Sequence, residues 1–595
     1  MRHRLFRFAL VLLAAFLSLS LNGKVVTKQK AMEFATRFFA NNAKSRGASG
    51  DMNFVWDSNQ LSSKTRSSEN SPTFYVFTPA NGEGFVIVAG DDASVPVLGY
   101  SFENEIPNVD RLPQNLRSWL EGVHESITYS RLQGDVSSSS IEKRWTQSRA
   151  GDPLVLLETP TWNQRNPYNA QCPMDGAERA LVGCTPVAIA TIMRYYEWPK
   201  AGKGTTEAYT TSTKGIRVGA RNLEHQYDWD KMKMEYVGNS YTNEEANAVA
   251  ILMADIAMGI QADFTNESTS SAADVEVLYN HFDYHPGMYW AVRENCNDFE
   301  EWKQLMVNEL MKDRPILYSG WSSDNSRGHS FVLDGCTTDD YFHINFGWGG
   351  YCDGYFYLDA LTPQDGRDTD YSYNQWALLN MIPNDGSEVA DQIVAYQSEI
   401  QSGITTNVSD FFPYTSFDVT ACVQNSSAIE FKGSFRLAVT DSEGNIKEWI
   451  SNEIKEINLK PRYYYPSLNF SCTINGDIVI GDRIRMFYKK QDSEEWNLIT
   501  SLSSNIPWEI LIMDEYTISE STSVSFDKDT GILLISFKDN VAATMLRNGE
   551  PIFTGITYNQ NSVEIETKNL PEGIYTIKLE KGFDVKEFDF EVKPL

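Results

Sequence analysis

The residue best suited to covalent chemistry is Cys184, in the run Val182-Gly183-Cys184-Thr185-Pro186-Val187. Apolar side chains after it recur at helical spacing, at Ile189, Ile192, Met193 and Tyr196. A proline suits the first turn of a helix, so Cys184 is predicted at a helix N-terminus. The dipole and free N–H groups there favour a thiolate and lower a thiol pKa. An ordinary buried cysteine at a helix start is the alternative.

A thiolate nucleophile needs a base, and His329 is the best candidate among the seven histidines. It follows Gly328 and leads into an apolar run, Phe331-Val332-Leu333, so it is expected at the start of a strand where it can face a cleft. Cysteine and histidine far apart in sequence but adjacent in space are typical of thiol proteases. His343 alternates with Phe342 and Ile344 and is predicted to be structural.

Two amides could complete such a site. Gln164, in Trp162-Asn163-Gln164, could donate to an oxyanion together with the N–H of Cys184. Asn345 could accept from the imidazole N–H and fix its tautomer and tilt. A plain surface amide is the alternative for Gln164.

A glycine-aromatic run, Phe346-Gly347-Trp348-Gly349-Gly350, follows Asn345. Phe346 and Trp348 could form a wall that shields the histidine and asparagine from water. A hairpin turn is the alternative for this run.

The order and spacing of these blocks resemble the streptopain family of secreted bacterial cysteine proteases, which includes interpain and periodontain. The resemblance rests on the blocks above and on Pro167-Tyr168-Asn169, Trp198-Pro199, Asp334-Gly335 and Asp353-Gly354-Tyr355-Phe356. Gly84–Asp92 and Pro96–Ser101 resemble the family's propeptide. The likeness covers about 24–385.

This resemblance implies a papain-like fold with Cys184 as nucleophile, His329 as base and acid, and Gln164 in the oxyanion hole. It also implies an inhibitory prodomain that proteolysis removes between Ser137 and Ala150. Phe346 departs from the family, which usually has Trp directly after the strand Asn. Thr185-Pro186 departs from the small residues that often follow the family's Cys.

Composition and charge narrow the function classes. The chain has 595 residues, 42% hydrophobic and 22% charged, which is typical of globular proteins. Its formal charge of −29 disfavours nucleic acid as the main partner. Basic residues followed by the apolar run Phe8–Leu21 predict a signal peptide over 1–23. The protein is therefore expected to be secreted and extracellular, with the cell surface and the periplasm as alternative locations. An uncleaved anchor is the alternative, but a spanning helix needs ~20 residues.

Changes in composition and in the period of the apolar residues along the chain predict a multidomain α+β protein. We expect an α+β prodomain at 24–136, an exposed activation linker at 137–150 and a papain-like cysteine protease domain at 151–389. Short alternating runs separated by turns then predict two β-sandwich modules, at 390–512 and 513–595. Gly573–Ile577 resembles the last module of proteins exported by type IX secretion, and a plain adhesive or spacer sandwich is the alternative. Cys422 and Cys472 could pair or stay free.

The leading hypothesis is a secreted cysteine endopeptidase made as a zymogen, with protein or peptide substrates and its own prodomain as inhibitor. A catalytically silent, protease-like binding or adhesion protein is the second, and another papain-fold activity such as a transglutaminase or amidase is the third. The mechanism needs no cofactor. The sequence has no CxxC pair and no HExxH, so no metal site is predicted.

Overall fold

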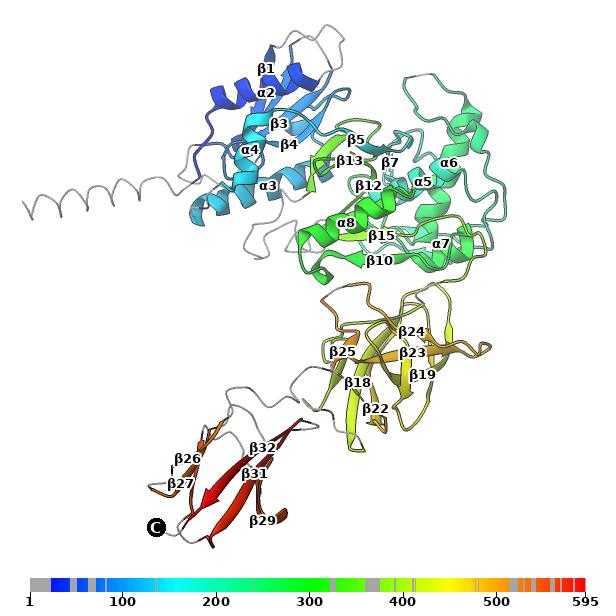
Figure 1. The fold of residues 1–595 in the computed structure, drawn as a ribbon. Helices are drawn as coiled ribbons and strands as arrows, with labels where there is room; N and C mark the ends of the chain where they lie inside the picture. Colours follow the sequence, from blue (N-terminus) through cyan, green and yellow to red (C-terminus); the bar gives the residue numbers. More distant parts are fainter. Residues whose placement is uncertain are drawn as a thin grey trace, which may run out of the picture. The chain divides into compact units, whose positions relative to one another are not determined.

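The computed structural model describes residues 23–593 (Figure 1), apart from internal segments at 43–50, 62–70, 81–82, 134, 136, 239, 322–327, 359–374, 390–391, 409–410, 412–413, 477, 480, 504, 513–522, 528–529, 537–541, 557–561, 568–569 and 582–583. Except for Gly23, the predicted signal peptide lies outside the described residues. Contacts divide the chain into a first unit, Met1–Gln392 with Ser426–Ile429 and Leu502–Asn505, and a second unit formed by the remainder.

The first unit contains long helices and short strands, and the helix predicted to begin at Cys184 is present. The helices are α2 (Lys28–Asn42), α3 (Gln114–Gln133), α4 (Ser139–Gln147), α5 (Cys184–Tyr196), α6 (Asn243–Gly259), α7 (Val275–Phe282) and α8 (Phe299–Leu310). The strands are β1 (Met52–Asp57), β2 (Phe74–Pro79), β3 (Phe85–Ala89), β4 (Val97–Ser101), β5 (Pro153–Leu156), β10 (Tyr289–Val292), β11 (Ile316–Trp321), β12 (Gly328–Thr337), β13 (Tyr341–Asn345), β14 (Gly354–Tyr357) and β15 (Trp376–Leu379). Two short hairpins are β6 (Met174–Asp175) with β7 (Glu178–Arg179), and β8 (Tyr209–Thr210) with β9 (Arg217–Val218).

Strands β1 to β4 form a meander that is covered on both faces. Phe74 and Val76 of β2 pack in the core that contains the apolar side of α3. Tyr75 and Phe77 point the other way, into the core that contains α2. Because successive side chains of a strand face opposite sides, a strand buried on both faces reads as a continuous apolar run. This explains why β2 and β3 lack polar alternation.

The meander is continuous with the sheet of the following region. The sheet has 11 strands in the order β1-β2-β3-β4-β14-β13-β12-β11-β15-β10, with β5 paired to β12. At the junction, Gly99 of β4 lies opposite Phe356 of β14. A Cβ at Gly99 would lie 2.5 Å from the Phe356 ring, so only glycine fits there.

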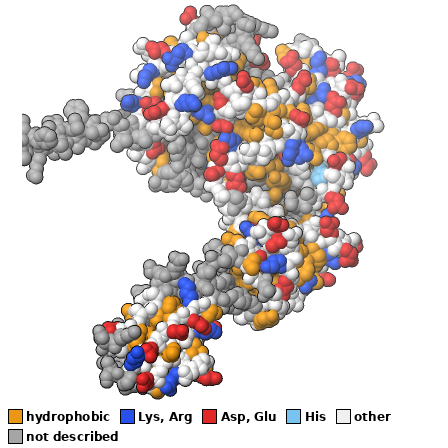
Figure 2. Space-filling model, in the orientation of Figure 1, with side chains coloured by type: hydrophobic (Ala, Val, Ile, Leu, Met, Phe, Trp, Pro, Cys, Tyr) orange, Lys and Arg blue, Asp and Glu red, His pale blue; other side chains and the backbone are white. Residues whose placement is uncertain are grey.

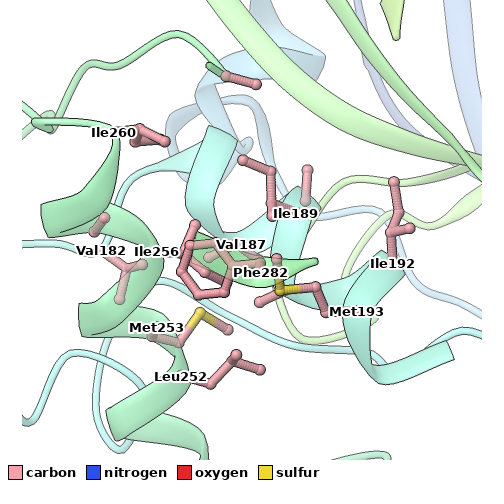
Figure 3. Packing of buried hydrophobic residues seen from close by; sticks show 14 of the residues in the cluster. Val182, Val187, Ile189, Ile192, Met193, Leu252, Met253, Ile256, Ile260 and Phe282 are labelled. Atoms are coloured by element: carbon pink, nitrogen blue, oxygen red, sulfur yellow. The ribbon is translucent and has the colours of Figure 1, made fainter. Parts of the chain in front are cut away.

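Helix α5 is the central helix of the region after residue 151. Its apolar side chains pack against α6 through Val187, Met193, Leu252, Met253 and Ile256 (Figure 3). The residues from Thr185 to Met193 are all buried, so the helix is enclosed by protein rather than lying on the surface. Helices α5 to α8 precede strands β11 to β15, which confirms the α+β prediction.

The segment expected as an exposed linker contains a helix, α4. Ser138 accepts a hydrogen bond from the Ile141 N–H and so caps the helix start. Ile141 is buried, and the Trp145 indole donates to the Ser94 carbonyl at 2.9 Å. Tertiary anchoring therefore overrides the loop propensity of the serine run that suggested an exposed segment.

The second unit consists of β structure with two separate cores, as predicted. The first core lies between the sheets β16-β18-β17, with β22 paired to β18, and β20-β19-β23-β24, with β21 and β25 attached. The second lies between β26-β27-β30 and β29-β28-β31-β32. The strand bounds are β16 (Ile393–Ala395), β17 (Ile404–Thr406), β18 (Ser416–Asn425), β19 (Phe431–Thr440), β20 (Ile446–Trp449), β21 (Lys455–Leu459), β22 (Tyr464–Thr473), β23 (Arg483–Lys490), β24 (Asn497–Leu498), β25 (Glu509–Leu511), β26 (Ser523–Asp527), β27 (Ile532–Ser536), β28 (Ala542–Arg547), β29 (Glu550–Ile556), β30 (Ser562–Glu566), β31 (Gly573–Lys581) and β32 (Asp584–Val592). Cys422 and Cys472 are both free thiols.

Acidic and basic side chains of the described residues are interspersed on the face shown in Figure 2. Across the part of the chain that the structure describes, no helix is both long and apolar enough to cross a bilayer.

A buried ion pair anchors the end of α3 to the meander. The Arg131 Nε lies 3.0 Å from Asp91 Oδ2, and the same guanidinium donates to the carbonyls of Ser71, Pro72 and Gly90. Burial raises the pKa of the Asp91 carboxyl, and Arg131 opposes that rise. Loss of the guanidinium therefore leaves the buried Asp91 carboxylate without its counter-ion and removes a donor from three carbonyls.

We predict that Arg131→Met lowers the free energy of unfolding by about 3–5 kcal/mol at neutral pH, because one partner of a buried pair is removed. Denaturant unfolding of the full chain, followed by tryptophan fluorescence, measures this. Lys30→Met, at an exposed position on α2, is the matched control. Equal unfolding midpoints for the two variants would contradict the prediction.

Candidate active site

Cys184 is the first residue of α5, as the sequence predicted. Gly183 precedes it at the N-cap with φ 99°, a conformation that L side chains rarely adopt. No side chain caps this end of the helix, and Pro186 has no N–H, so the Cys184 and Thr185 N–H groups are the backbone donors of its first three residues. The helix start therefore provides the electropositive environment that a thiolate requires.

Exposure distinguishes Cys184 from the other cysteines. It is partly exposed, whereas the other six are buried. Burial raises the pKa of the Cys336 thiol to about 11, and it raises the pKa of Cys172, Cys296 and Cys472 to about 12. These buried thiols are poor nucleophiles, so Cys184 is the thiol placed to react.

His329 is the second residue of β12 and is half-buried. The next residue, Ser330, donates its backbone N–H to the Cys184 Sγ at 3.5 Å. On one edge of β12 the pairing with β13 ends at Val332, opposite Asn345, and on the other edge Ser330 pairs with Ser319 of β11. The fold thus brings the base candidate and the thiol together from positions more than a hundred residues apart.

The His329 ring also lies close to the N-terminal region. Its Nε2 is 3.5 Å from the Ser118 Oγ of α3, on the helix that packs over the meander. The N-terminal region therefore contacts the candidate base directly, through Ser118.

Gln164 lies beside the Cys184 loop. Its backbone carbonyl accepts the Val182 N–H at 3.1 Å, two residues before the thiol, and its side chain is buried. The Gly349 N–H donates to the Trp162 carbonyl at 2.8 Å, so the glycine-aromatic loop also reaches this segment. The predicted oxyanion donor is thus close to the thiol in the fold, and its catalytic role stays a prediction.

Asn345 ends β13 with its amide engaged in hydrogen bonds. The Nδ2 donates to the Thr159 hydroxyl at 3.1 Å and to the Pro160 carbonyl at 3.0 Å. The Oδ1 accepts the Gly347 N–H at 3.1 Å. The predicted bond from the imidazole to Asn345 stays a prediction.

The predicted aromatic wall lies largely inside the protein. Phe346 is 2% exposed, and its ring lies 5.8 Å from that of Phe331 and 5.3 Å from that of Phe356. Trp348 is partly buried against the same core. Phe346 therefore supports the sheet beneath the site, and the shielding role of both rings stays a prediction.

A buried polar cluster that the sequence did not reveal lies under the Asn345 loop. Asp334 accepts from the Thr159 hydroxyl and from His343 Nδ1, each at 2.5 Å. Asp353 accepts the Phe346 N–H at 2.9 Å. His343 is thus structural, as predicted. The sequence feature that could have revealed Asp334 is the presence of an acidic residue in an otherwise apolar strand.

Asp353 and His343 of this cluster bind protons more tightly than free side chains do. Burial raises the pKa of Asp353 to about 7, although the Phe346 N–H and His343 oppose the rise. Burial opposes the charge of His343, but the Asp334 carboxylate outweighs it and raises the pKa of that imidazole. Both pKa values lie above those of the unfolded chain, so bound protons stabilise the fold. For Asp353 that stability is complete below about pH 4 and is lost as the pH rises through about 7, whereas for His343 it is complete below about pH 6.5 and is lost above its raised pKa.

We predict that Asp353→Asn removes part of this pH dependence, because the neutral amide can still accept the Phe346 N–H. One pKa unit corresponds to about 1.4 kcal/mol, so the parent should lose up to about 4 kcal/mol relative to the variant between pH 4 and pH 8. Thermal unfolding across this range measures the difference, with Asp110→Asn at an exposed position as control. Parallel pH profiles for the parent and Asp353→Asn would contradict the assignment.

Two parts of the chain are similar to known protein families. Residues 162–356 match the model of the Peptidase C10 family, and residues 23–127 match that of the Spi protease inhibitor. The thiol protease/hemagglutinin PrtT of Porphyromonas gingivalis is 29% identical over 437 residues, which cover 69% of this chain and 47% of PrtT. Streptopain of Streptococcus pyogenes is 28% identical over 366 residues, which cover 56% of this chain and 88% of streptopain.

Two solved structures from Prevotella intermedia are also similar. The prointerpain A fragment is 27% identical with a TM-score of 0.43, covering 52% of this chain and 96% of the fragment. Active interpain A cysteine protease is 30% identical with a TM-score of 0.33, and the match covers 38% of this chain and 93% of the interpain A chain.

Proposed function

Because the chain belongs to the Peptidase C10 family of cysteine peptidases, we propose that it is a cysteine endopeptidase made as a zymogen, with Cys184 as nucleophile and His329 as base. Residues 24–136 are the proposed inhibitory prodomain, and residues 1–23 the proposed export signal. Proteins and peptides are the proposed substrates. The assignment is a proposal for the whole chain, which spans about half the length of PrtT.

One observation carries the proposal: the Ser330 N–H donates to the Cys184 Sγ at 3.5 Å. It places the residue directly after His329 against the thiol at a helix N-terminus. A backbone donor and a helix dipole both favour the charged form of the sulfur. This arrangement supports a thiolate that is ready to attack a carbonyl carbon.

In the proposed reaction, the Cys184 thiolate attacks the peptide carbonyl and the carbonyl oxygen takes the negative charge. The Gln164 amide and the Cys184 N–H would donate to this oxyanion, and one such donor contributes about 10²–10³-fold in rate. The His329 imidazolium then protonates the leaving amine, which leaves a thioester on Cys184. Neutral His329 removes a proton from water, and the resulting hydroxide hydrolyses the thioester.

The contact between Ser118 and His329 supports the zymogen part of the proposal, because α3 then occupies space next to the base. The pairing of β4 with β14 supports it as well, because it fixes the N-terminal region to the sheet that carries His329. Cleavage between Ser137 and Ala150 would sever the covalent link between the two regions. Helix α4 covers most of that range, so the local backbone must open before a protease can cut within it.

We predict that Cys184→Ala abolishes casein digestion that a thiol-protease inhibitor blocks, because no other thiol can form the thioester. The variant should also accumulate as the unprocessed chain if maturation is autocatalytic. Casein digestion with and without the inhibitor, together with mass spectrometry of the N-terminus, measures both effects.

Cys422→Ala, which removes a thiol of the second unit, is the control and should digest casein like the parent. Equal digestion by the Cys184→Ala variant would overturn the proposed function and favour a different catalytic group. An inactive parent that still binds proteins would favour the binding or adhesion hypothesis.

A further inference from the structure

A buried chain of hydroxyl groups lies directly behind the candidate dyad. The Thr185 Oγ1 is 2.9 Å from the Ser330 Oγ, and Ser330 in turn is 2.8 Å from the Ser319 Oγ. The Thr185 hydroxyl also bonds to the Ser271 carbonyl at 3.0 Å. Thr185 and Ser330 are only 2% and 6% exposed, so water does not easily replace these bonds.

The donors of this chain follow from proton counting. A carbonyl only accepts, so the single Thr185 proton goes to Ser271. Thr185 must therefore accept from Ser330, and Ser330 must accept from Ser319. Each hydroxyl proton has one assigned acceptor, so the chain has one consistent direction.

The hydroxyl bond between Thr185 and Ser330 joins residues that are next to the candidate dyad in the sequence. Thr185 directly follows Cys184 on α5, and Ser330 directly follows His329 on β12. The hydroxyl bond thus joins the elements that carry the nucleophile and the base, one residue away from each. The Ser330 N–H that meets the sulfur belongs to the same linked residue.

We propose that Thr185 and Ser330 are positioning residues that hold Cys184 and His329 in register through their hydroxyl bond. This inference rests on the proposed function and adds two residues that act through the dyad without contacting substrate. Loss of the bond lets the helix start and the strand shift apart. A misplacement of about 1 Å can cost about 100-fold in rate.

The test uses Thr185→Val and Ser330→Ala in the full chain. Processing with trypsin, followed by a serine-protease inhibitor, matures the chain independently of its own activity. We expect kcat on a peptide substrate to fall about 10- to 100-fold with little change in KM, because the hydroxyls lie away from substrate. The apparent pKa of Cys184 alkylation by iodoacetamide should rise, because the Ser330 N–H moves away from the sulfur. Thr185→Ser keeps the hydroxyl and should recover most of the activity.

Thr191→Val is the matched control. Thr191 lies on the same helix, is 1% exposed, and its hydroxyl has no hydrogen-bond partner. This variant makes the same chemical change without breaking a bond, so both kcat and the alkylation profile should stay at the parent level.

The double variant Thr185→Val/Ser330→Ala separates positioning from stability. The shared bond is lost only once in the double variant, which leaves the Ser271 carbonyl and the Ser319 hydroxyl without partners, so its loss of melting temperature should be smaller than the sum of the two single losses. If the bond positions the dyad, kcat of the double variant stays as low as that of the slower single variant. Parent-like kcat in the double variant would overturn the proposal, as would parent-like kcat in both single variants.

The alkylation readout needs no turnover, so it separates this inference from the proposed function. If the parent proves inactive on peptides, the proposed function fails. The positioning role is then judged by whether the alkylation pKa rises in Thr185→Val and Ser330→Ala but not in Thr191→Val, and an unchanged value overturns it.

Discussion

The proposed chemistry of this chain depends on how the N-terminus of α5 packs against the start of β12. The Ser330 N–H points at the Cys184 sulfur there, and the Thr185 and Ser330 side chains bond beside it. Most of helix α5 is held by packing, because its residues from Thr185 to Met193 are buried. Packing thus fixes the helix as a rigid body, and a few polar contacts set the position of its first residue.

The same sheet links the candidate site to the N-terminal region. Strand β4 pairs with β14, and Gly99 allows the Phe356 ring to lie against its backbone. Helix α3 then reaches His329 through Ser118. In the proposed maturation, release of residues 24–136 would free the base and leave β14 as an edge strand. One interface would therefore serve both to keep the zymogen folded and to keep it inactive.

Sequence patterns predicted the elements well where burial is periodic. The helix that begins at Cys184 was expected because apolar residues recur on one face, and the two β modules were expected from alternation and turn residues. Helix α4 was missed because serines have loop propensity, whereas the anchoring of Ile141 and Trp145 comes from distant segments. Propensity reports local preferences and carries no information about such partners.

In the candidate site, too, local sequence patterns identified some residues, whereas contacts between distant segments could not be predicted. Residue chemistry and the family resemblance singled out Cys184, His329 and Gln164, and the fold brings them close together. The bond between Thr185 and Ser330 joins residues 145 apart, and neither residue type is unusual in its local context. The aromatic run was expected to shield the histidine and asparagine from water. Phe346 lies within the core between Phe331 and Phe356, and its shielding role stays a prediction.

The central claim is that the thiol of Cys184 and the imidazole of His329 act as one unit. Labelling of the matured chain with a peptidyl electrophile, with the modified residue identified by mass spectrometry, tests this most directly. The account predicts that Cys184 is the thiol modified and that His329→Ala slows its labelling at neutral pH by at least about 100-fold, whereas His281→Ala does not. Preferential labelling of another cysteine, or an equal rate in the His329→Ala variant, would contradict it.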